Sequence, residues 1–427
     1  MKFYLISLGC PKNLTNSEEF SARLLAKGHQ LVFTPDQADE IIINTCGFIA
    51  SAVREAKDEI RRALELKQAG VVKKVAVTGC LVERFKEQLA REFPQIDTLF
   101  SIAAQDDIET TLNTRGVILT PLPTSLYLPK YKMSLTAPHT AYLKIADGCN
   151  NRCAYCTIPF IRGRYRSKPM EDILREARLM SQNGVKEISL IAQDTTSYGM
   201  DLYGKVQFLP LLEKLLKIRG LKRLRIMYAY PHRMTRDIAR LMASTDQIFH
   251  YVDIPLQHIA DPVLRRMNRH CDGTQIRRTL DMLKKEVPDI SLRTNFIVGF
   301  PGETKKDFNE LKKFVNEYEF DNLGVFEYFR EKGTAAYEMK QVPAALKHER
   351  ARELEEVQSR VIDRINKRLI GTTLEAIADG PDFGRTYKDA PDIDGKVTFT
   401  HPVQAGTIFK ARVVAAQGYE REVTPVK

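Results

Sequence analysis

The sequence predicts an α/β protein in three parts: an N-terminal parallel α/β sheet domain, a central βα barrel and a small C-terminal all-β barrel. Short apolar runs alternate with helical stretches in the first third of the chain, and the alternation resumes with a longer period from about residue 140. Strands that alternate with helices form parallel sheets covered on both faces. The tail has short β-rich pieces separated by Gly, Pro and Asp turns.

The N-terminal domain is expected over residues 1–115. Apolar runs predict strands at 3–8, 31–33, 40–44, 74–78 and 96–100. Amphipathic stretches predict helices at 17–26, 51–68 and 81–92. Residues 116–138 hold four prolines and little periodicity, which predicts a linker.

The central domain is expected over residues 139–343. Its candidate strands are 142–147, 187–193, 224–230, 251–256, 291–298 and 323–329. Helices are expected between them, for example at 171–182, 209–217, 234–243, 274–286 and 304–317. Six βα units predict a full or partial parallel barrel. An open, doubly wound sheet is the alternative.

The last two segments differ in composition. Residues 344–370 are highly charged and contain no Gly or Pro, which predicts a long connecting helix. Residues 371–427 contain short candidate strands at 373–377, 395–399 and 407–414. They predict a small β-barrel that is stable only if it packs on the rest of the chain.

The composition is that of a globular protein. Of 427 residues, 43% are hydrophobic and 28% charged, which excludes wholesale disorder. There is no long apolar run and no signal-peptide pattern, so a cytoplasmic protein without a membrane partner is expected. Seven cysteines in a reducing compartment favour metal or redox chemistry over disulfides.

The strongest motif is Cys149-x3-Cys153-x2-Cys156, directly after the first expected strand of the barrel. Structural zinc usually takes four ligands, and no His or further Cys lies nearby in sequence. Thiolates are the usual ligands of iron–sulfur clusters, and three ligands leave one iron of a four-iron cluster open. Zinc and buried structural thiols remain alternatives.

A second group is spread along the chain. Cys10, Cys46 and Cys80 each follow the carboxyl end of an expected parallel strand, and a glycine flanks each of them. Ligands gather at this edge of an α/β sheet. The sequence therefore predicts a second site with three thiolates, with unrelated buried thiols as the alternative.

The first motif, at the mouth of a βα barrel, resembles the radical S-adenosylmethionine (SAM) enzymes. In that superfamily the open iron chelates SAM, and cleavage of SAM yields a radical that abstracts hydrogen from an unactivated carbon. The resemblance implies that Tyr155 lies near the adenine of SAM. It also implies that Gln193 and Asp194, after the second strand, and Gly299 and Glu303, after the fifth, line the SAM pocket.

Both cysteine groups, the α/β domain, the barrel and the β-rich tail together resemble the methylthiotransferases, over essentially the whole chain. The resemblance implies two 4Fe-4S clusters: Cys149, Cys153 and Cys156 hold the SAM-binding one, and Cys10, Cys46 and Cys80 the auxiliary one. It implies that SAM supplies both a methyl group and a radical, and that the tail is a TRAM-type barrel. No catalytic side chain is identified, because the chemistry is cluster-based. A monomer served by an electron donor protein is expected.

Two stretches, 7–13 (SLGCPKN) and 384–395, resemble the branch of this family that modifies the β-carbon of an aspartate in small-subunit ribosomal protein S-twelve. This resemblance implies that the free ribosomal protein or the ribosome is the partner.

Charge in the tail agrees with that branch. A barrel that grips RNA should be basic, but residues 368–427 carry eight basic and eight acidic side chains. Loop 379–394 is rich in acidic residues, which suit a basic protein. We expect Asp389, Asp392 and Asp394 to dock the substrate.

Two alternatives follow from other features. The formal net charge of +11 lies mostly in the middle of the chain, residues 135–343, and a basic middle domain suits a transfer RNA adenosine methylthiotransferase. An iron–sulfur electron-transfer or RNA-binding scaffold is a non-enzymatic alternative. Electron carriers usually saturate their clusters with four ligands, which disfavours it.

Overall fold

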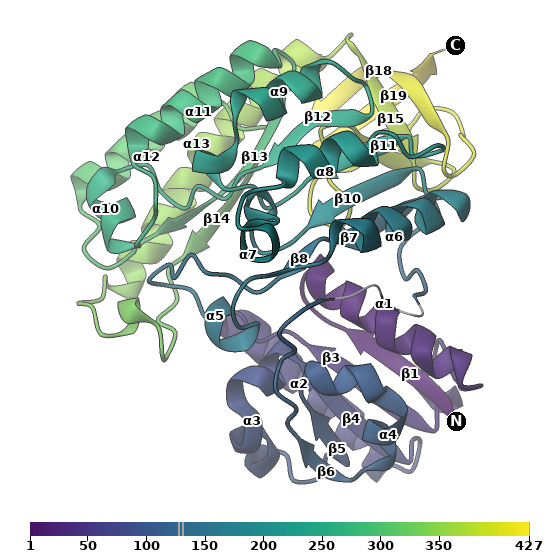
Figure 1. The fold of residues 1–427 in the computed structure, drawn as a ribbon. Coiled ribbons are helices and arrows are strands. Elements are labelled where there is room, and N and C mark those ends of the chain that lie inside the picture. The colour runs from purple at the N-terminus through teal and green to yellow at the C-terminus, as the bar shows by residue number, and fades with distance from the viewer. Residues whose placement is uncertain (127–128, 130–131, 427) are drawn as a thin grey trace.

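The computed structural model describes residues 1–126, 129 and 132–426. The chain forms an N-terminal α/β part, a larger central α/β part and a small β-barrel (Figure 1). The N-terminal part and the barrel lie on different sides of the central part. Among the described residues, no helix is both long and apolar enough to cross a membrane.

The N-terminal part is one parallel sheet with strand order β2-β1-β3-β4-β5-β6. Its strands are β1 (Lys2–Ser7), β2 (Gln30–Val32), β3 (Glu40–Thr45), β4 (Lys74–Gly79), β5 (Thr98–Phe100) and β6 (Gly116–Ile118). Its helices are α1 (Pro11–Ala26), α2 (Ala50–Gln68), α3 (Cys80–Glu92) and α4 (Ile108–Asn113), with 3-10 turns η1 (Pro35–Gln37) and η2 (Ala103–Asp107). Strand β3 is buried throughout, which explains its continuous apolar run.

Two features of this part differ from expectation. Helix α1 begins at Pro11 and not at Ser17, because Pro is well suited to the first helical position, where its missing N–H is not needed. Its first turns bury polar side chains, so they lack the apolar period of a surface helix. Strand β6 lies inside the expected linker and pairs with β5.

The central sheet is parallel and open, with order β14-β13-β12-β11-β10-β7. Its strands are β7 (Thr140–Lys144), β10 (Glu187–Ile191), β11 (Arg223–Ile226), β12 (Ile248–Asp253), β13 (Ser291–Val298) and β14 (Asn322–Glu327). Strand order follows chain order without reversal, as in a βα barrel and unlike a doubly wound sheet. The partial-barrel form of the prediction is therefore confirmed.

Helices and short elements connect these strands. The helices are α5 (Ile158–Ile161), α6 (Met170–Gln182), α7 (Met200–Tyr203), α8 (Phe208–Leu215), α9 (Arg236–Ala243), α10 (Asp261–Arg266), α11 (Gly273–Glu286) and α12 (Lys305–Tyr318). A small hairpin pairs β8 (Ala146–Asp147) with β9 (Arg166–Ser167), and 3-10 turns lie at η3 (Thr195–Ser197), η4 (Pro231–Arg233) and η5 (Ala335–Tyr337).

A long helix, α13 (Ala344–Leu369), packs on α12 and β14 and leads into the C-terminal barrel. The barrel is closed, with order β15-β16-β17-β19-β18. Its strands are β15 (Thr373–Ala378), β16 (Phe383–Thr386), β17 (Val397–Phe399), β18 (Ile408–Gln417) and β19 (Glu420–Val426). Closure leaves no free edge and encloses a small core of aliphatic and aromatic side chains.

The acidic loop between β16 and β17 is not the exposed surface that its composition suggests. Asp389 forms an ion pair with Arg421 at 2.8 Å, and both side chains are fully buried. The Asp394 carboxylate pairs with Arg293 of β13 at 3.0 Å and accepts a hydrogen bond from Tyr251 of β12 at 2.7 Å. These two carboxylates bind cations and hydroxyls of their own chain, so they do not form a docking surface.

The third carboxylate of this loop, Asp392, is on an exposed residue, but it accepts a hydrogen bond from Tyr142 of β7 at 2.9 Å. Ala390 packs into a cluster with Tyr142, Phe249 and Tyr251 on the central strands. The loop therefore fills the amino-terminal end of the partial barrel and joins the small barrel to it.

Candidate functional site

Three cysteines meet at the carboxyl edge of the N-terminal sheet. Cys10 follows β1, Cys46 follows β3 and Cys80 follows β4, and these three strands are neighbours in the sheet. Cys10 is the N-cap residue of α1, and Cys80 is the first residue of α3. The N-terminus of a helix favours negative charge, so this edge suits thiolates.

Glycines allow the three cysteine-bearing loops to approach one another. Gly9 has φ +90°, and a Cβ on it would lie 2.8 Å from the Cβ of Cys46. A Cβ on Gly47 would lie 2.7 Å from the Leu81 backbone. Side chains at these positions would force the loops apart. The packing thus fits three thiols held around one shared group.

The three thiols have different electrostatic surroundings. Burial raises the pKa of Cys46 to about 11, and it also raises the pKa of Cys80. Burial acts in the same direction on Cys10, but Lys12, Arg162 and backbone N–H groups outweigh it and lower the pKa of that thiol. Cys10 is therefore the thiol of this group with a pKa below the ordinary value.

The second group, Cys149, Cys153 and Cys156, lies on the loop between β8 and α5. The Cys149 backbone N–H donates to the Gly163 carbonyl at 3.2 Å, and the Cys156 N–H donates to the Cys153 carbonyl at 3.0 Å. Arg269 Nη1 donates to Cys153 Sγ at 3.6 Å. Burial raises the pKa of Cys149 to about 11. The loop is thus held in a compact turn with its thiols close together.

Each of the two groups offers three free thiols. Within residues 1–126, 129 and 132–426, no three His, Cys, Asp or Glu side chains are arranged to hold one metal ion. A four-iron cluster binds each thiolate through a different iron, so its ligands stand further apart than those of one ion. Three thiols in each group match the donor set of a four-iron cluster that keeps one iron open.

Two expected SAM-pocket residues lie at the cysteine loop: Tyr155 is part of it, and Gln193 lies beside its start. The Tyr155 ring packs edge-on against Phe300, with centroids 6.4 Å apart. Gln193 Nε2 donates to Asp147 Oδ1 at 2.9 Å, while its buried Oε1 finds no hydrogen-bond partner among the described side chains and backbone. An unpartnered, buried amide oxygen beside the second cysteine group can accept a hydrogen bond from a ligand.

Asp194 is 1% exposed and holds this region together. Its carboxylate accepts hydrogen bonds from Asn151 at 3.0 Å, from Thr196 at 2.7 Å and from the Ser197 hydroxyl at 2.6 Å. Because Asn151 lies between two of the cysteines, Asp194 fixes the cysteine loop to the end of β10.

The expected residues after β13 contact helix α13. Glu303 pairs with Arg350 at 3.0 Å, and its side chain is fully buried. Burial raises the pKa of Glu303 to about 7. Gly299 has φ +68°, and a side chain there would collide with Lys347. In this structure both residues secure the turn after β13 against the connecting helix.

Sequence reasoning missed the residue that joins the two cysteine groups. Arg162, just after α5, is 1% exposed. Its Nη2 donates to Cys80 Sγ at 3.3 Å and to Asn13 Oδ1 at 3.2 Å, and its Nη1 donates to Asn16 Oδ1 at 2.8 Å and to Asp147 Oδ2 at 3.3 Å. Only the tertiary fold reveals this junction, because the partners lie far apart in sequence.

Lys12 is a second buried cation at this junction. Its Nζ lies 3.2 Å from the centroid of the Tyr228 ring, at the end of β11. Tyr228 has φ +57°, an uncommon conformation for an aromatic residue that points to a constrained site. The first turn of α1 therefore reaches the carboxyl edge of the central sheet.

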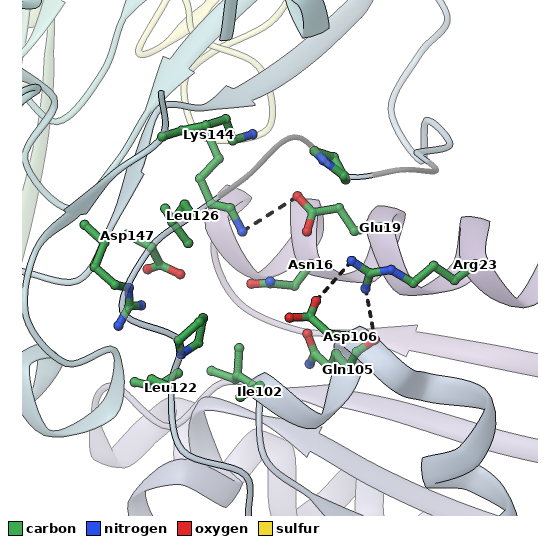
Figure 2. A pocket seen from close by; sticks show the side chains of 15 residues that line it. Asn16, Glu19, Arg23, Ile102, Gln105, Asp106, Leu122, Leu126, Lys144 and Asp147 are labelled. Atoms are coloured by element: carbon green, nitrogen blue, oxygen red, sulfur yellow. Dashed lines mark hydrogen bonds and ion pairs between the residues drawn. The ribbon is translucent and has the colours of Figure 1, made fainter. Parts of the chain in front are cut away.

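A pocket opens beside Arg162, between α1 and η2 on one side and β7 to β9 on the other (Figure 2). Asp147 lies on its wall. Lys144 lies 3.8 Å from Glu19 across the pocket, and on the N-terminal side Arg23 of α1 lies 3.0 Å from Asp106 of η2. The pocket thus follows the junction between the two α/β parts.

Three family models match the chain. Residues 143–315 match the radical SAM superfamily, residues 2–101 match an uncharacterized protein family, UPF0004, and residues 370–426 match the TRAM domain. These matches fall on the central part, the N-terminal part and the C-terminal barrel respectively.

Curated relatives match almost the entire length. The ribosomal protein uS12 methylthiotransferase RimO of Elusimicrobium minutum is 48% identical over 423 residues, which is 98% of each chain. The protein of the same name from Carboxydothermus hydrogenoformans is 43% identical and covers 92% of each chain.

Solved structures share the fold at low identity. The radical SAM methyltransferase TsrM of Kitasatospora setae aligns with a TM-score of 0.57 at 13% identity, over 78% of this chain and 76% of that one. The cobalamin-dependent radical SAM enzyme OxsB aligns with a TM-score of 0.55 at 12% identity, over 84% of this chain and 56% of that one.

Proposed function

This chain belongs to the family of ribosomal protein uS12 methylthiotransferases, and on that premise we propose that it replaces a hydrogen on the β-carbon of an aspartate in uS12 with a methylthio group. It is a radical SAM enzyme that uses an iron–sulfur cluster and SAM. The observation that carries the proposal is the pair of three-cysteine groups at the carboxyl edges of two parallel sheets, joined through Arg162.

We assign Cys149, Cys153 and Cys156 to the SAM-binding 4Fe-4S cluster and the cysteines after β1, β3 and β4 to an auxiliary 4Fe-4S cluster. When bound, the clusters supply the electron that cleaves SAM and the open iron that presents sulfur. The glycine-permitted packing around Cys46 supports the second assignment. The chain's own side chains hold the two loops, exclude water and fix their spacing.

The SAM-pocket assignments differ in their support. Tyr155 belongs to the cysteine loop, and Gln193 lies beside it with an amide oxygen that accepts no described hydrogen bond. Asp194 is proposed to act by positioning that loop through Asn151. Gly299 and Glu303 are proposed to shape the far wall of the pocket, since their contacts in this structure are to α13.

We propose that the enzyme works as a cytoplasmic monomer with a protein electron donor.

Asp392 is the only one of the three expected docking residues on an exposed position, and its carboxylate already accepts a hydrogen bond from Tyr142. We therefore place no substrate docking on Asp389 or Asp394. The transfer RNA alternative has less support, because the similar curated relatives are named for uS12.

The first test counts clusters. Anaerobically reconstituted chain should hold about eight irons, and replacing Cys10, Cys46 and Cys80 with Ala should leave about four. That variant should still cleave SAM reductively, because its other cysteine group is intact, and should form no methylthiolated uS12. Iron analysis, 5′-deoxyadenosine assay and mass spectrometry of a uS12 substrate measure the three quantities.

Two controls complete this test. Cys271→Ala removes a buried cysteine outside both groups and should leave the iron content unchanged. A wild-type chain with only about four irons would refute the two-cluster assignment. A chain that methylthiolates transfer RNA and ignores uS12 would refute the substrate.

A further inference from the structure

We propose that Arg162 raises the reduction potential of the auxiliary cluster by donating a charged hydrogen bond to the sulfur of Cys80. This inference rests on the proposed function, because it requires a cluster at Cys10, Cys46 and Cys80. It adds a role for a residue of the central domain in tuning a cluster held by the N-terminal domain.

The first support is the position of the guanidinium. Arg162 follows the short helix after the Cys149–Cys156 loop, yet its Nη2 lies 3.3 Å from the Sγ of Cys80 in the other domain. The side chain is 1% exposed, so water does not screen the charge.

The second support is that the guanidinium is held in place. Asn13 and Asn16 of α1 accept from it on the N-terminal side, and Asp147 accepts from it on the central side. Asp147 Oδ1 in turn accepts from the backbone N–H of Gly148 at 2.9 Å, directly before Cys149. One chain of hydrogen bonds thus runs from a cysteine of one group to the start of the other.

The orientation of this pair determines the direction of the effect. Nη2 faces the sulfur of Cys80, whereas Asp147 binds Nη1. The positive end of the pair therefore points at the auxiliary site. Reduction adds negative charge to a cluster, and hydrogen bonds to its sulfurs and nearby cations stabilise the reduced state. Removal of Arg162 should lower the potential.

The experiment uses the full chain in which Cys149, Cys153 and Cys156 are Ala, so that only the auxiliary cluster titrates. Its midpoint potential is measured by a redox titration followed by electron paramagnetic resonance. Arg162→Met should shift the potential to more negative values, and Arg162→Lys should recover part of the shift because it keeps the charge.

Arg84→Met is the matched control. Arg84 also bridges the two domains, donating to the Gly47 carbonyl at 2.9 Å and pairing with Glu331, but it has no described contact with sulfur. Its removal should shift the potential less than removal of Arg162 does.

The outcomes separate the two proposals. An unchanged potential in Arg162→Met with full iron content would overturn the role of Arg162 and leave the two-cluster assignment standing. Absence of iron from the background variant itself would refute the two-cluster assignment, and this inference with it. If Arg162→Met loses its iron, the midpoint potentials of Arg162→Lys and Arg162→Gln are compared instead. The proposal requires a more negative potential in Arg162→Gln, which lacks the charge, and equal potentials would overturn it.

Discussion

Individual buried charges in this protein find partners from distant segments, and this limits what the sequence predicts about them. The cysteines could be predicted, because their spacing and their place after apolar strands are local signals. The partners of Arg162 and Glu303 could not, since Cys80 and Arg350 meet them only after the domains pack. Glu303 is expected at a ligand site, and the structure pairs it with α13.

Glu303 predicts a pH dependence of stability. Its folded-state pKa of about 7 lies above the ordinary 4.5, so the folded chain binds more protons between these values. The free energy of unfolding contributed by this group is therefore highest below pH 4.5 and falls by about 3 kcal/mol as pH rises through 7. Glu303→Gln removes this loss. Urea unfolding at pH 5 and pH 8 measures the free energy of unfolding of both proteins. The stability of the variant relative to wild type should be higher at pH 8 than at pH 5. The same difference in stability at both pH values would contradict the raised pKa of Glu303.

Secondary-structure elements were predicted best where burial is uniform. Strand β3 is largely an apolar run, and the structure has a fully buried strand at that place. The start of helix α1 and the exposure of the loop between β16 and β17 differ from the prediction for one reason: each segment buries polar side chains against another domain. A charged composition normally indicates an exposed segment, but here each buried carboxylate has its own cation or hydroxyl.

That loop carries the second stability prediction. Arg421→Met leaves the Asp389 carboxylate buried without its partner, which should cost about 3–5 kcal/mol. Arg412→Met, at an exposed position of the same barrel, should change stability by about 0.5 kcal/mol or less. The double variant Asp389→Leu, Arg421→Met should recover most of the loss, because no charge remains buried. Chemical unfolding of the three variants measures these differences, and equal losses for Met at 412 and 421 would contradict the prediction.

The whole molecule is joined through the interior of the partial barrel. One hydrophobic cluster contains central residues such as Tyr142 and Tyr251, and both Leu14 of α1 and Ala390 of the C-terminal loop pack in it. Segments from all three parts therefore pack in one cluster there. The order of the parts could be predicted from alternation and composition, whereas this shared interior could not, because it depends on register between distant segments.

Removal of residues 370–427 tests this arrangement. Truncation would uncover Tyr142 and Tyr251, and it would remove one of the two ion-pair partners of Glu187 and one of the two of Arg293. We expect the shortened chain to aggregate and to bind a hydrophobic dye, as measured by size-exclusion chromatography and fluorescence. If the barrel served only to recognise substrate, the truncated chain, residues 1–369, would stay monodisperse. That result would contradict the role of the barrel in covering the interior of the central domain.

The position of the closing loop also has a consequence for biosynthesis. The central half-barrel leaves the ribosome before the residues that fill its amino-terminal end exist, and the final segment takes roughly 3–12 s to translate. During that interval Tyr142, Tyr251 and the buried arginine of β11 face solvent. The nascent chain therefore passes through a state in which the apolar interior of the partial barrel is exposed. Slow translation or early termination in this segment would prolong that state and make the chain a target of chaperones and proteases.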